Sequence, residues 1–407
     1  MGLYEVSSYQ ELEQMAKEWK GEVCLFGAGL IGKTWGYDVI QKAGFHIDYY
    51  CDNNVPQGQI IRNNIQCIGP ENIFNKEILV FITVGKKYQK DIINELLENG
   101  INKMVVVDYF FMQVMIESII NSKDSQAKER YKCIIDDEEY IKNLFLYKVG
   151  YPLNIENPKT FNEKIQWLKF YNRKPEYTMM VDKYEVREYI QNMIGEKYLI
   201  PLVGGPYANV NEIEWDKLPN QFVLKCNHDS GSVIICKDKS KFDFVAAEEK
   251  LAYALKYNFW YSGREWPYKD VKRKIIAEKY MTELSEVIDY KFMCFNGKVK
   301  IIFTCTERYS GGQLKVTFFD TEWNRMPFER HYPSSNKVIA KPLNLNLMII
   351  LAEKLCKNIP FVRVDFYEIN NKVYFGEMTF FPGGGMEEFT PQKWDGILGE
   401  WIELPKK

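Results

Sequence analysis

Short apolar runs follow two different rhythms along the chain, and this change restricts the folds open to it. From Glu22 to Asp108, the runs EVCLF, IDYYCD, ILVFITV and MVVVD alternate with a glycine turn and helix-like spacers. Such alternation is typical of βαβ units and predicts a parallel sheet. Beyond Pro219 the runs become hairpin-like, and Asn296-Gly297 is a strong two-residue turn signal. The sequence therefore predicts an α/β region followed by an α+β region.

The second region opens with segments of helical pattern and continues with strands. We expect helices within 136–150, 160–171 and 181–194, and strands within 221–227, 232–238, 274–280, 288–295, 298–306, 316–319, 362–369 and 372–380. Between the two regions, SIINSKDSQAKERYK is polar and lacks glycine turns, which is typical of a linker. We therefore expect domains over residues 1–120 and 132–407, joined by a linker at 121–131.

Composition excludes several classes of protein. Hydrophobic residues make up 46% of the 407 residues, which excludes a disordered chain. The formal net charge of -2 leaves no basic field for nucleic acid. The apolar runs fall short of the ~20 residues of a spanning helix, so we expect no direct membrane insertion. Nine cysteines without a CxxC pair, and an N-terminus without an export signal, favour a cytoplasmic protein.

A glycine loop follows the first of the βαβ strands. Gly27, Gly29 and Gly32 form GAGLIG between a predicted strand and a predicted helix, and Asp52 ends the next strand. In a Rossmann-like domain, such glycines admit a pyrophosphate near the helix N-terminus, and the acid accepts a hydrogen bond from a ribose hydroxyl. The loop therefore predicts a nucleotide-binding α/β domain.

Two other interpretations of this loop stay open. With Lys33-Thr34, the same letters also satisfy a P-loop, and Asp108 could take the place of its magnesium-holding acid. A tight turn without a ligand is the third interpretation. We favour the Rossmann-like domain because a P-loop needs neither Gly29 nor Asp52.

The stretch through Gly100 resembles the N-terminal domain of sugar-modifying acyltransferases and related bacterial polysaccharide enzymes. The resemblance rests on GAGLIG, on the pair Asp52-Asn53 and on the segment GQIIRNNIQCIGPENI. It implies a site for a nucleotide or a nucleotide-sugar.

Charged residues interrupt apolar strands of the second region, where an unpaired charge is costly. Lys225 precedes the loop HDSGS, and a strand lysine beside flexible backbone donors suits a phosphate. In VRVDFYEINNKVYFGEMTF, Asp365 and Glu377 lie on two strands of a predicted hairpin, and Arg363 shares a face with Asp365. Convergent carboxylates suit Mg²⁺, although solvent-facing hairpins would show similar patterns. Direct pairing of the two acids requires an odd loop, because a two-residue Asn-Asn turn would place them on opposite faces.

Six motifs stand in order between Tyr131 and Pro405: YKVGYPLNIENPKTFNEKIQWLKFYNR, DKYEVREYI, LPNQFVLKCNHDSG, DYKFMCFNGKVK, VRVDFY and GEMTFFPGGG. With them the chain resembles the TupA-like ATP-grasp family of bacterial capsule and teichuronic-acid-type polysaccharide clusters. The resemblance implies a fold in which two α+β lobes hold Mg-ATP. It implies ATP contacts for Lys183, Lys225, Ser230, Gly231, Ser232, Glu278, Lys279, Met281 and Asp289, catalytic roles for Arg363 and Lys291, and metal ligation by Asp365, Glu377 and Thr379. Thr379 departs from the general pattern, in which an Asn often completes the metal site.

The resemblance further implies a carboxylate–amine ligase that forms an acylphosphate and releases ADP and phosphate. Its substrates would be a carboxylate, either a uronic acid or an amino acid of a surface polysaccharide precursor, and an amine. A glycosyl- or phosphoryl-transferase and a nucleotide-sensing binding module are the alternatives. Joint retention of Lys225, Arg363, Asp365 and Glu377 argues against the binding module.

Overall fold

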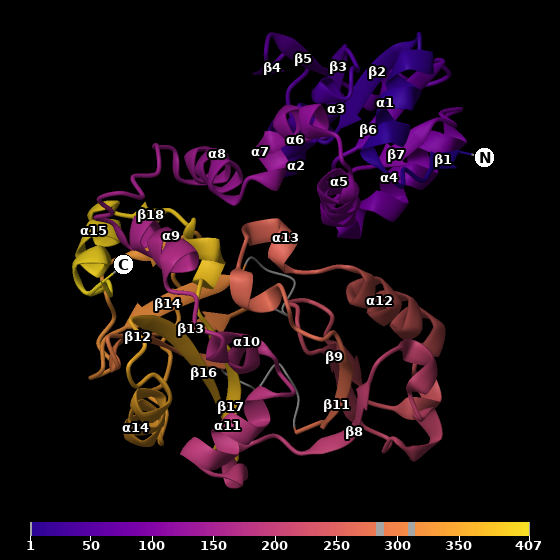
Figure 1. Ribbon diagram of the computed structural model, residues 1–407. Helices are drawn as coiled ribbons and strands as arrows, with labels where there is room; N and C mark the ends of the chain where they lie inside the picture. The colour runs from indigo at the N-terminus through magenta and orange to yellow at the C-terminus, as the bar shows by residue number, and fades with distance from the viewer. Residues whose placement is uncertain (1, 282–288, 308–313, 407) are drawn as a thin grey trace. The chain divides into compact units, whose positions relative to one another are not determined.

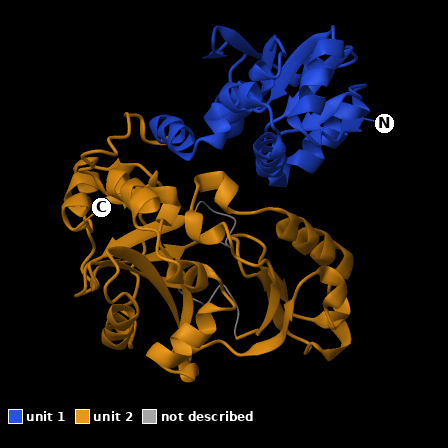
Figure 2. Cartoon of the chain, viewed as in Figure 1, with its two compact units in different colours: residues 1–147 blue, residues 148–407 orange. Residues whose placement is uncertain are grey.

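The computed structural model describes residues 2–281, 289–307 and 314–406 and divides the chain into two compact units, residues 1–147 and 148–407 (Figure 2). The expected linker at 121–131 lies inside the first unit, where it includes the whole of helix α6, Ser125–Arg130. The functional division at 120 and 132 stays a prediction. No helix in these described ranges is long and apolar enough to cross a membrane.

The first unit is built around the expected parallel sheet. Its order is β1-β7-β6-β2-β3-β5-β4, and every pairing is parallel except that of β4 with β5. Strand β2 lies between β3 and β6, so the strand order reverses beside β2, which is where α/β sheets commonly bind ligands. The strands are β1 Leu3–Tyr4, β2 Glu22–Phe26, β3 Tyr49–Cys51, β4 Ile60–Arg62, β5 Ile65–Ile68, β6 Ile78–Ile82 and β7 Met104–Val106.

The helices of this unit include two that matter for the glycine loop. Helix α2, Leu30–Lys33, follows the loop and ends at Thr34, where α3 begins anew. The helix expected after GAGLIG is therefore present, but it breaks after four residues. The remaining helices are α1 Tyr9–Glu18, α3 Trp35–Lys42, α4 Lys86–Glu98, α5 Tyr109–Asn121, α6 Ser125–Arg130, α7 Lys132–Ile135 and α8 Asp137–Val149, which runs on past the division (Figure 1).

The second unit contains two antiparallel sheets. A four-stranded sheet has the order β10-β9-β11-β8, and a five-stranded sheet has the order β14-β13-β12-β16-β17. The strands are β8 Leu202–Tyr207, β9 Phe222–Cys226, β10 Ile234–Cys236, β11 Ile275–Lys279, β12 Asp289–Phe295, β13 Lys298–Thr306, β14 Lys315–Phe319, β16 Phe361–Ile369 and β17 Lys372–Thr379, with the small pair β15 Glu329–Arg330 and β18 Phe389–Thr390.

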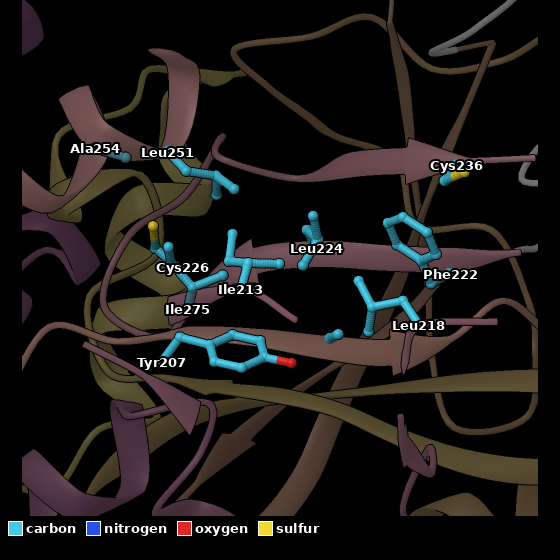
Figure 3. Packing of buried hydrophobic residues seen from close by; sticks show 11 residues of the cluster. Tyr207, Ile213, Leu218, Phe222, Leu224, Cys226, Cys236, Leu251, Ala254 and Ile275 are labelled. Atoms are coloured by element: carbon cyan, nitrogen blue, oxygen red, sulfur yellow. The ribbon is translucent and has the colours of Figure 1, made fainter. Parts of the chain in front are cut away.

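Each sheet of the second unit packs against helices. Beneath the four-stranded sheet, Phe222, Leu224 and Ile275 form a buried cluster with Leu251 of α12 (Figure 3). Helix α14 contacts β12, β13 and β16. The helices are α9 Phe161–Tyr171, α10 Glu176–Val181, α11 Val186–Met193, α12 Phe244–Lys256, α13 Trp260–Gly263, α14 Leu345–Leu355 and α15 Lys393–Glu400. Alternating polar and apolar faces thus leave one surface of each sheet for charged side chains.

Most expected strands of this unit are confirmed, but one helix and one strand are not as expected. The helix expected over 181–194 is broken, because Asp182 leaves the helical conformation and accepts hydrogen bonds from the backbone N–H groups of Tyr184 and Glu185. Strand β8 was not expected, since its sequence LVGGPY is rich in residues that disfavour strands. It forms an edge strand that pairs with β11.

Candidate functional site

The β16–β17 hairpin carries the two acids singled out in the sequence. It turns at Asn370-Asn371, whose φ angles of 51° and 60° fit a two-residue turn. The odd loop required by the sequence argument is therefore wrong. Such a turn alone would place Asp365 and Glu377 on opposite faces of the sheet.

A β-bulge restores their common face. The pairing shifts by one residue between Phe366–Phe375 and Val364–Met378, so β17 contributes an extra residue opposite Asp365. Gly376 stands in this bulge, where a Cβ atom would lie 3.2 Å from the carbonyl oxygen of Asp365. The close approach of the two backbones explains the glycine.

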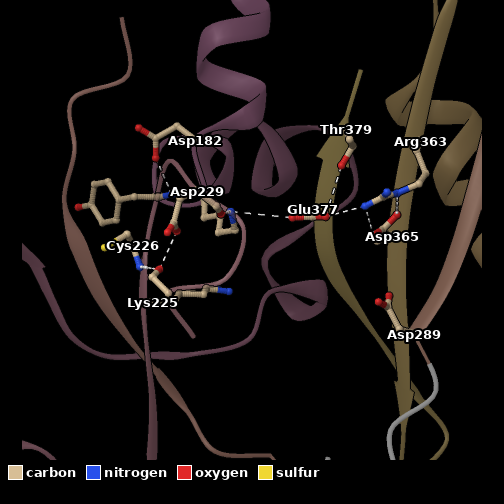
Figure 4. A network of polar contacts seen from close by, with 12 residues as sticks. Asp182, Lys225, Cys226, Asp229, Asp289, Arg363, Asp365, Glu377 and Thr379 are labelled. Atoms are coloured by element: carbon tan, nitrogen blue, oxygen red, sulfur yellow. Dashed lines mark hydrogen bonds and ion pairs between the residues drawn. The ribbon is translucent and has the colours of Figure 1, made fainter. Parts of the chain in front are cut away.

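Arg363 joins the two carboxylates (Figure 4). It donates to both oxygens of Asp365 at 2.7 Å, and its Nη2 also donates to Oε1 of Glu377 at 2.6 Å. Burial raises the pKa of Glu377, but Lys183, Arg363 and further cations outweigh it and lower the pKa to about 2. Glu377 is therefore ionised at neutral pH, although 34% of its side chain is exposed.

The neighbouring strand β12 extends this network. Lys291 stands opposite Asp365 and forms ion pairs with it and, at 2.6 Å, with Asp289. Burial lowers the pKa of Lys291, but these two acids outweigh it, so the pKa lies above its ordinary value. Thr379 Oγ1 donates to Oε1 of Glu377 at 3.3 Å. The face thus holds the candidate metal and catalytic residues together.

The four-stranded sheet supplies a second group of charges. Lys225 of β9 forms a 2.7 Å ion pair with Glu278 of β11, and the other oxygen of Glu278 lies 3.9 Å from Arg187 of α11. All three side chains are largely buried. The sequence analysis singled out Lys225 and Glu278 but missed Arg187, whose one signal was its place in the DKYEVREYI motif.

The loop after β9 connects the two groups. Lys183 donates to the carbonyl oxygen of Asp229 at 2.6 Å and lies 3.9 Å from Oε2 of Glu377, on the other sheet (Figure 4). Ser232 is buried. Its hydroxyl donates a hydrogen bond to the carboxylate of Asp229 at 2.6 Å and accepts one from the backbone N–H of Cys226. Ser230 and Gly231 remain exposed at the tip. The loop therefore offers free donors only at its tip.

This arrangement agrees with a match to a known family. The profile of the TupA-like ATP-grasp family matches residues 163–403, more than half of the chain. The chain belongs to this family. TupA-like ATP-grasp membership makes it an ATP-dependent ligase that binds ATP.

This TupA-like chain is also similar to several solved structures. It is similar to D-alanine–D-alanine ligase from Helicobacter pylori, at 17% identity over 60% of this chain and 69% of that chain, with a TM-score of 0.31. The ligase of the same name from Bacillus anthracis, complexed with ATP, is 14% identical over 88% and 85%, with a TM-score of 0.30. N5-carboxyaminoimidazole synthase from Aspergillus clavatus, in complex with ADP and 5-aminoimidazole ribonucleotide, is 10% identical over 88% and 69%, with a TM-score of 0.31. No curated protein matches the chain.

Other expected contacts of the TupA-like site lie at the end of β11. Lys279 is exposed, and its backbone N–H donates to the carbonyl oxygen of Pro201 at 2.9 Å. Met281 is half-buried at the edge of the described range. Among the residues that the structure describes, no three His, Cys, Asp or Glu side chains converge as a metal site.

Two buried residues anchor the loop after β9 in the TupA-like site. Asn227 is buried and its side chain donates to Asp182 at 2.8 Å and to the carbonyl of Lys272 at 2.9 Å. His228, the first residue of the loop HDSGS, is also buried, with Nε2 3.1 Å from the carbonyl oxygen of Tyr257. Burial lowers the pKa of His228, so the ring is neutral and holds the loop to the end of α12.

In the first unit, the glycine loop lines a cavity of about 610 Å³ at the carboxyl ends of β2 and β6. Gly27, Gly29 and Asp52 line it, but the carboxylate of Asp52 accepts hydrogen bonds from the backbone of Ala28 and Asn54, both at 2.8 Å. Gly32 is buried behind the loop, where a Cβ atom would lie 2.1 Å from the Gly27 oxygen. Glycine at 32 is therefore required by packing.

The P-loop residues do not meet at this cavity. Lys33 and Thr34 line a different cavity, of about 440 Å³, together with Arg62. Asp108 accepts hydrogen bonds from two backbone N–H groups at the start of α5, as an N-cap does. With four residues in α2, the helix N-terminus on which pyrophosphate binding was argued is also short. The geometry therefore disfavours the P-loop and leaves the cavity itself as the evidence for a ligand.

Proposed function

We propose that the chain is a carboxylate–amine ligase that forms an acylphosphate and releases ADP. The observation that carries this proposal is the contact of one guanidinium, Arg363, with two carboxylates on adjacent strands, Asp365 and Glu377. Acid pairs of this kind suit the Mg²⁺ that accompanies ATP, and the guanidinium suits the charge of a transferring phosphoryl group.

The proposed reaction has two steps. A carboxylate oxygen of the substrate forms a bond to the γ-phosphorus of ATP, and the bond from that phosphorus to the bridging oxygen breaks, releasing ADP. The amine nitrogen then bonds to the acyl carbon, phosphate leaves with the electrons of the C–O bond, and the amine loses a proton. Arg363 and Lys291 stabilise the charge on the phosphoryl oxygens.

ATP-binding roles are proposed for the residues around the two sheets. Lys183 and Lys225 bind phosphates, the tip at Ser230 to Ser232 covers them, and Glu278 to Met281 face the adenine. Asp289 is proposed to bind the ribose. Asp365, Glu377 and Thr379 would hold Mg²⁺, which supplies charge neutralisation to the phosphates. The carboxylate and hydroxyl oxygens of these three residues fit a hard cation. Oδ1 of Asp289 is buried without a hydrogen-bond partner among the described residues, which supports its proposed role as an acceptor for the ribose.

The substrate context is proposed from the resemblances. The carboxylate is a uronic acid or an amino acid of a bacterial surface polysaccharide, such as capsule or exopolysaccharide. The first domain, 1–120, is proposed to be Rossmann-like and to bind a nucleotide or nucleotide-sugar at Gly27, Gly29, Gly32 and Asp52. The cavity that exposes Gly29 supports this assignment.

One incubation tests the proposed reaction. The full chain is mixed with ATP, Mg²⁺, uronic-acid sugar nucleotides, amino acids and an amine pool, and the nucleotide and sugar products are identified by mass spectrometry. ADP with an amide-sized mass gain is expected. AMP, or a transferred sugar without an amide, would favour the transferase instead, and nucleotide binding without any product would favour a sensing module.

A further inference from the structure

A second buried guanidinium lies next to the candidate catalytic arginine. Arg330 of β15 is 6% exposed, and its guanidinium carbon lies 5.2 Å from the ring centre of Phe303 and 5.6 Å from that of Phe318. Its Nη1 lies 4.0 Å from the sulfur of Met293, which stands directly opposite Arg363 in the β12–β16 pairing. Arg330 is therefore one side chain away from Arg363.

Arg330 also shares a sheet face with the candidate site. Phe303 stands opposite Lys291 in the β12–β13 pairing, and Lys291 contacts Asp365. The sheet face that carries the site thus extends from Lys291 on β12 to Phe303 on β13, and the guanidinium of Arg330 lies over the ring of Phe303. Burial lowers the pKa of Arg330 below its ordinary value, and the nearby charge of Arg363 adds to this lowering, while Glu387 opposes it.

Within the described part of the chain, Arg330 has few hydrogen-bond partners for its guanidinium. A guanidinium has five N–H donors, and a buried one is expected to be paired. Among the described residues, Glu387 is its one carboxylate partner, with Nε and Oε2 2.9 Å apart, and Oε2 accepts no well-directed hydrogen bond. Nη1 faces a sulfur atom, a weak acceptor. Arg363, in contrast, already donates to Asp365 and Glu377.

Glu387 is held in place by the glycine turn after β17. Gly383 has a φ of +62°, and a Cβ atom there would lie 2.1 Å from the Glu387 carboxyl carbon. The backbone of Glu387 exchanges two hydrogen bonds with Asn162 of α9, and Gln166 and Lys169 of the same helix donate to the carbonyl of Gly384 at 2.9 Å. A fixed acid therefore orients Arg330 without saturating it.

We propose that Arg330 binds the carboxylate of the acid substrate beside Arg363, and that Glu387 orients the guanidinium for it. The inference rests on the proposed function and names the residue that recognises its acid substrate. A guanidinium backed by two aromatic rings keeps its planar edge of donors, which matches a carboxylate in two-point contact. Glu387 competes weakly for the same donors.

Calorimetric titration of the full chain with D-glucuronate tests this assignment, with D-glucose as the control that lacks the carboxylate. The wild type is expected to bind glucuronate and not glucose. Arg330→Gln should weaken glucuronate binding about tenfold or more, because a charge-assisted contact is lost. Glu387→Gln should strengthen it about two- to fivefold, because the competing carboxylate is removed. Titration with ADP, unchanged within about twofold in both variants, serves as the control for folding at the nucleotide site.

Several results would overturn the assignment: glucuronate binding no better than that of glucose, unchanged affinity in Arg330→Gln, or binding of glucose 6-phosphate but not of glucuronate. If Arg330→Gln does not fold, the gain in Glu387→Gln decides, and unchanged affinity there contradicts the proposal. Failure of the proposed function looks different. Glucuronate would then still bind through Arg330, while ATP and an amine pool yield no ADP.

Discussion

Replacing Glu377 by Gln should lower the stability of the protein in a pH-dependent way. A pKa lowered from its ordinary value of 4.5 to about 2 corresponds to roughly 3 kcal/mol favouring the ionised form in the folded state. Because 34% of the side chain is exposed, solvent screens the cations, and we expect about 1–2 kcal/mol.

The sign follows from the direction of the shift. A carboxyl group whose pKa falls on folding contributes its stability above its unfolded pKa and loses it as the pH falls toward the folded pKa. The difference between wild type and Glu377→Gln should therefore be complete at pH 7 and should shrink between about pH 5 and pH 2. Lys183 and Arg363 cause the effect, since both contact this carboxylate.

Urea unfolding at pH 7, 5, 4 and 3 measures this difference. Glu388→Gln, which changes an exposed acid of the same unit, serves as the matched control and should be neutral at every pH. An equal loss of stability at pH 7 and pH 3 would refute the reasoning, because it would mean that the charge of Glu377 is not what the folded state stabilises. Turnover at pH 7 should be lost in Glu377→Gln.

Three further predictions concern single residues. Lys225→Met should weaken ATP binding about tenfold or more and leave glucuronate binding unchanged, as measured by calorimetry, because the lysine lies beside Glu278 and away from Arg330; equal loss of both ligands would contradict its proposed role. Gly32→Ala should destabilise the first unit by about 1–3 kcal/mol in thermal unfolding, since its Cβ atom would lie 2.1 Å from the Gly27 oxygen. Gly29→Ala, whose Cβ atom would have nothing within 4 Å, should be neutral, and similar melting curves for the two variants would contradict this prediction. With Lys225→Met and Arg330→Gln together as background, UDP-glucuronate binding without Mg²⁺ should fall in Asp52→Ala and persist in Lys33→Ala, since Asp52 lines the glycine-loop cavity and Lys33 does not. Sensitivity at Lys33 with dependence on Mg²⁺ would favour the P-loop instead.

Strand alternation and hairpin signals predicted much of this structure. They indicated the parallel sheet of the first unit, the strands of the second and the shared face of Arg363 and Asp365, because side chains of a strand alternate strictly. The same rule failed for the relative placement of Asp365 and Glu377. The hairpin turns at Asn370-Asn371, and the bulge at Gly376 brings the two acids back to one face of the sheet. No local pattern in KVYFGEMTF predicts this bulge.

Other features depend on contacts between distant segments, which one sequence does not reveal. Arg187 reaches Glu278, and Arg330 reaches Met293, only after the sheets form. A distant residue also acts at the break at Thr34. Nη1 of Arg62 donates to the carbonyl oxygen of Lys33 at 3.0 Å, a group that a continuous helix would use itself, and to that of Thr34 at 3.1 Å. Strand β8 exists because β11 offers it an edge, against its own composition.

The pairing of charges described for the second unit also bears on how quickly a polyanion reaches it. Lys225, Lys291, Lys183 and Arg363 each have a carboxylate partner, so these four cations add little excess positive potential at the site. Attraction over distances beyond the ~8 Å Debye length of physiological salt is correspondingly small. Encounter with a nucleotide is then governed by ordinary diffusion and orientation, so we expect an association rate constant that changes little with ionic strength. Selectivity arises after the encounter, when the phosphates of the nucleotide replace the carboxylates as partners of the lysines and the arginine.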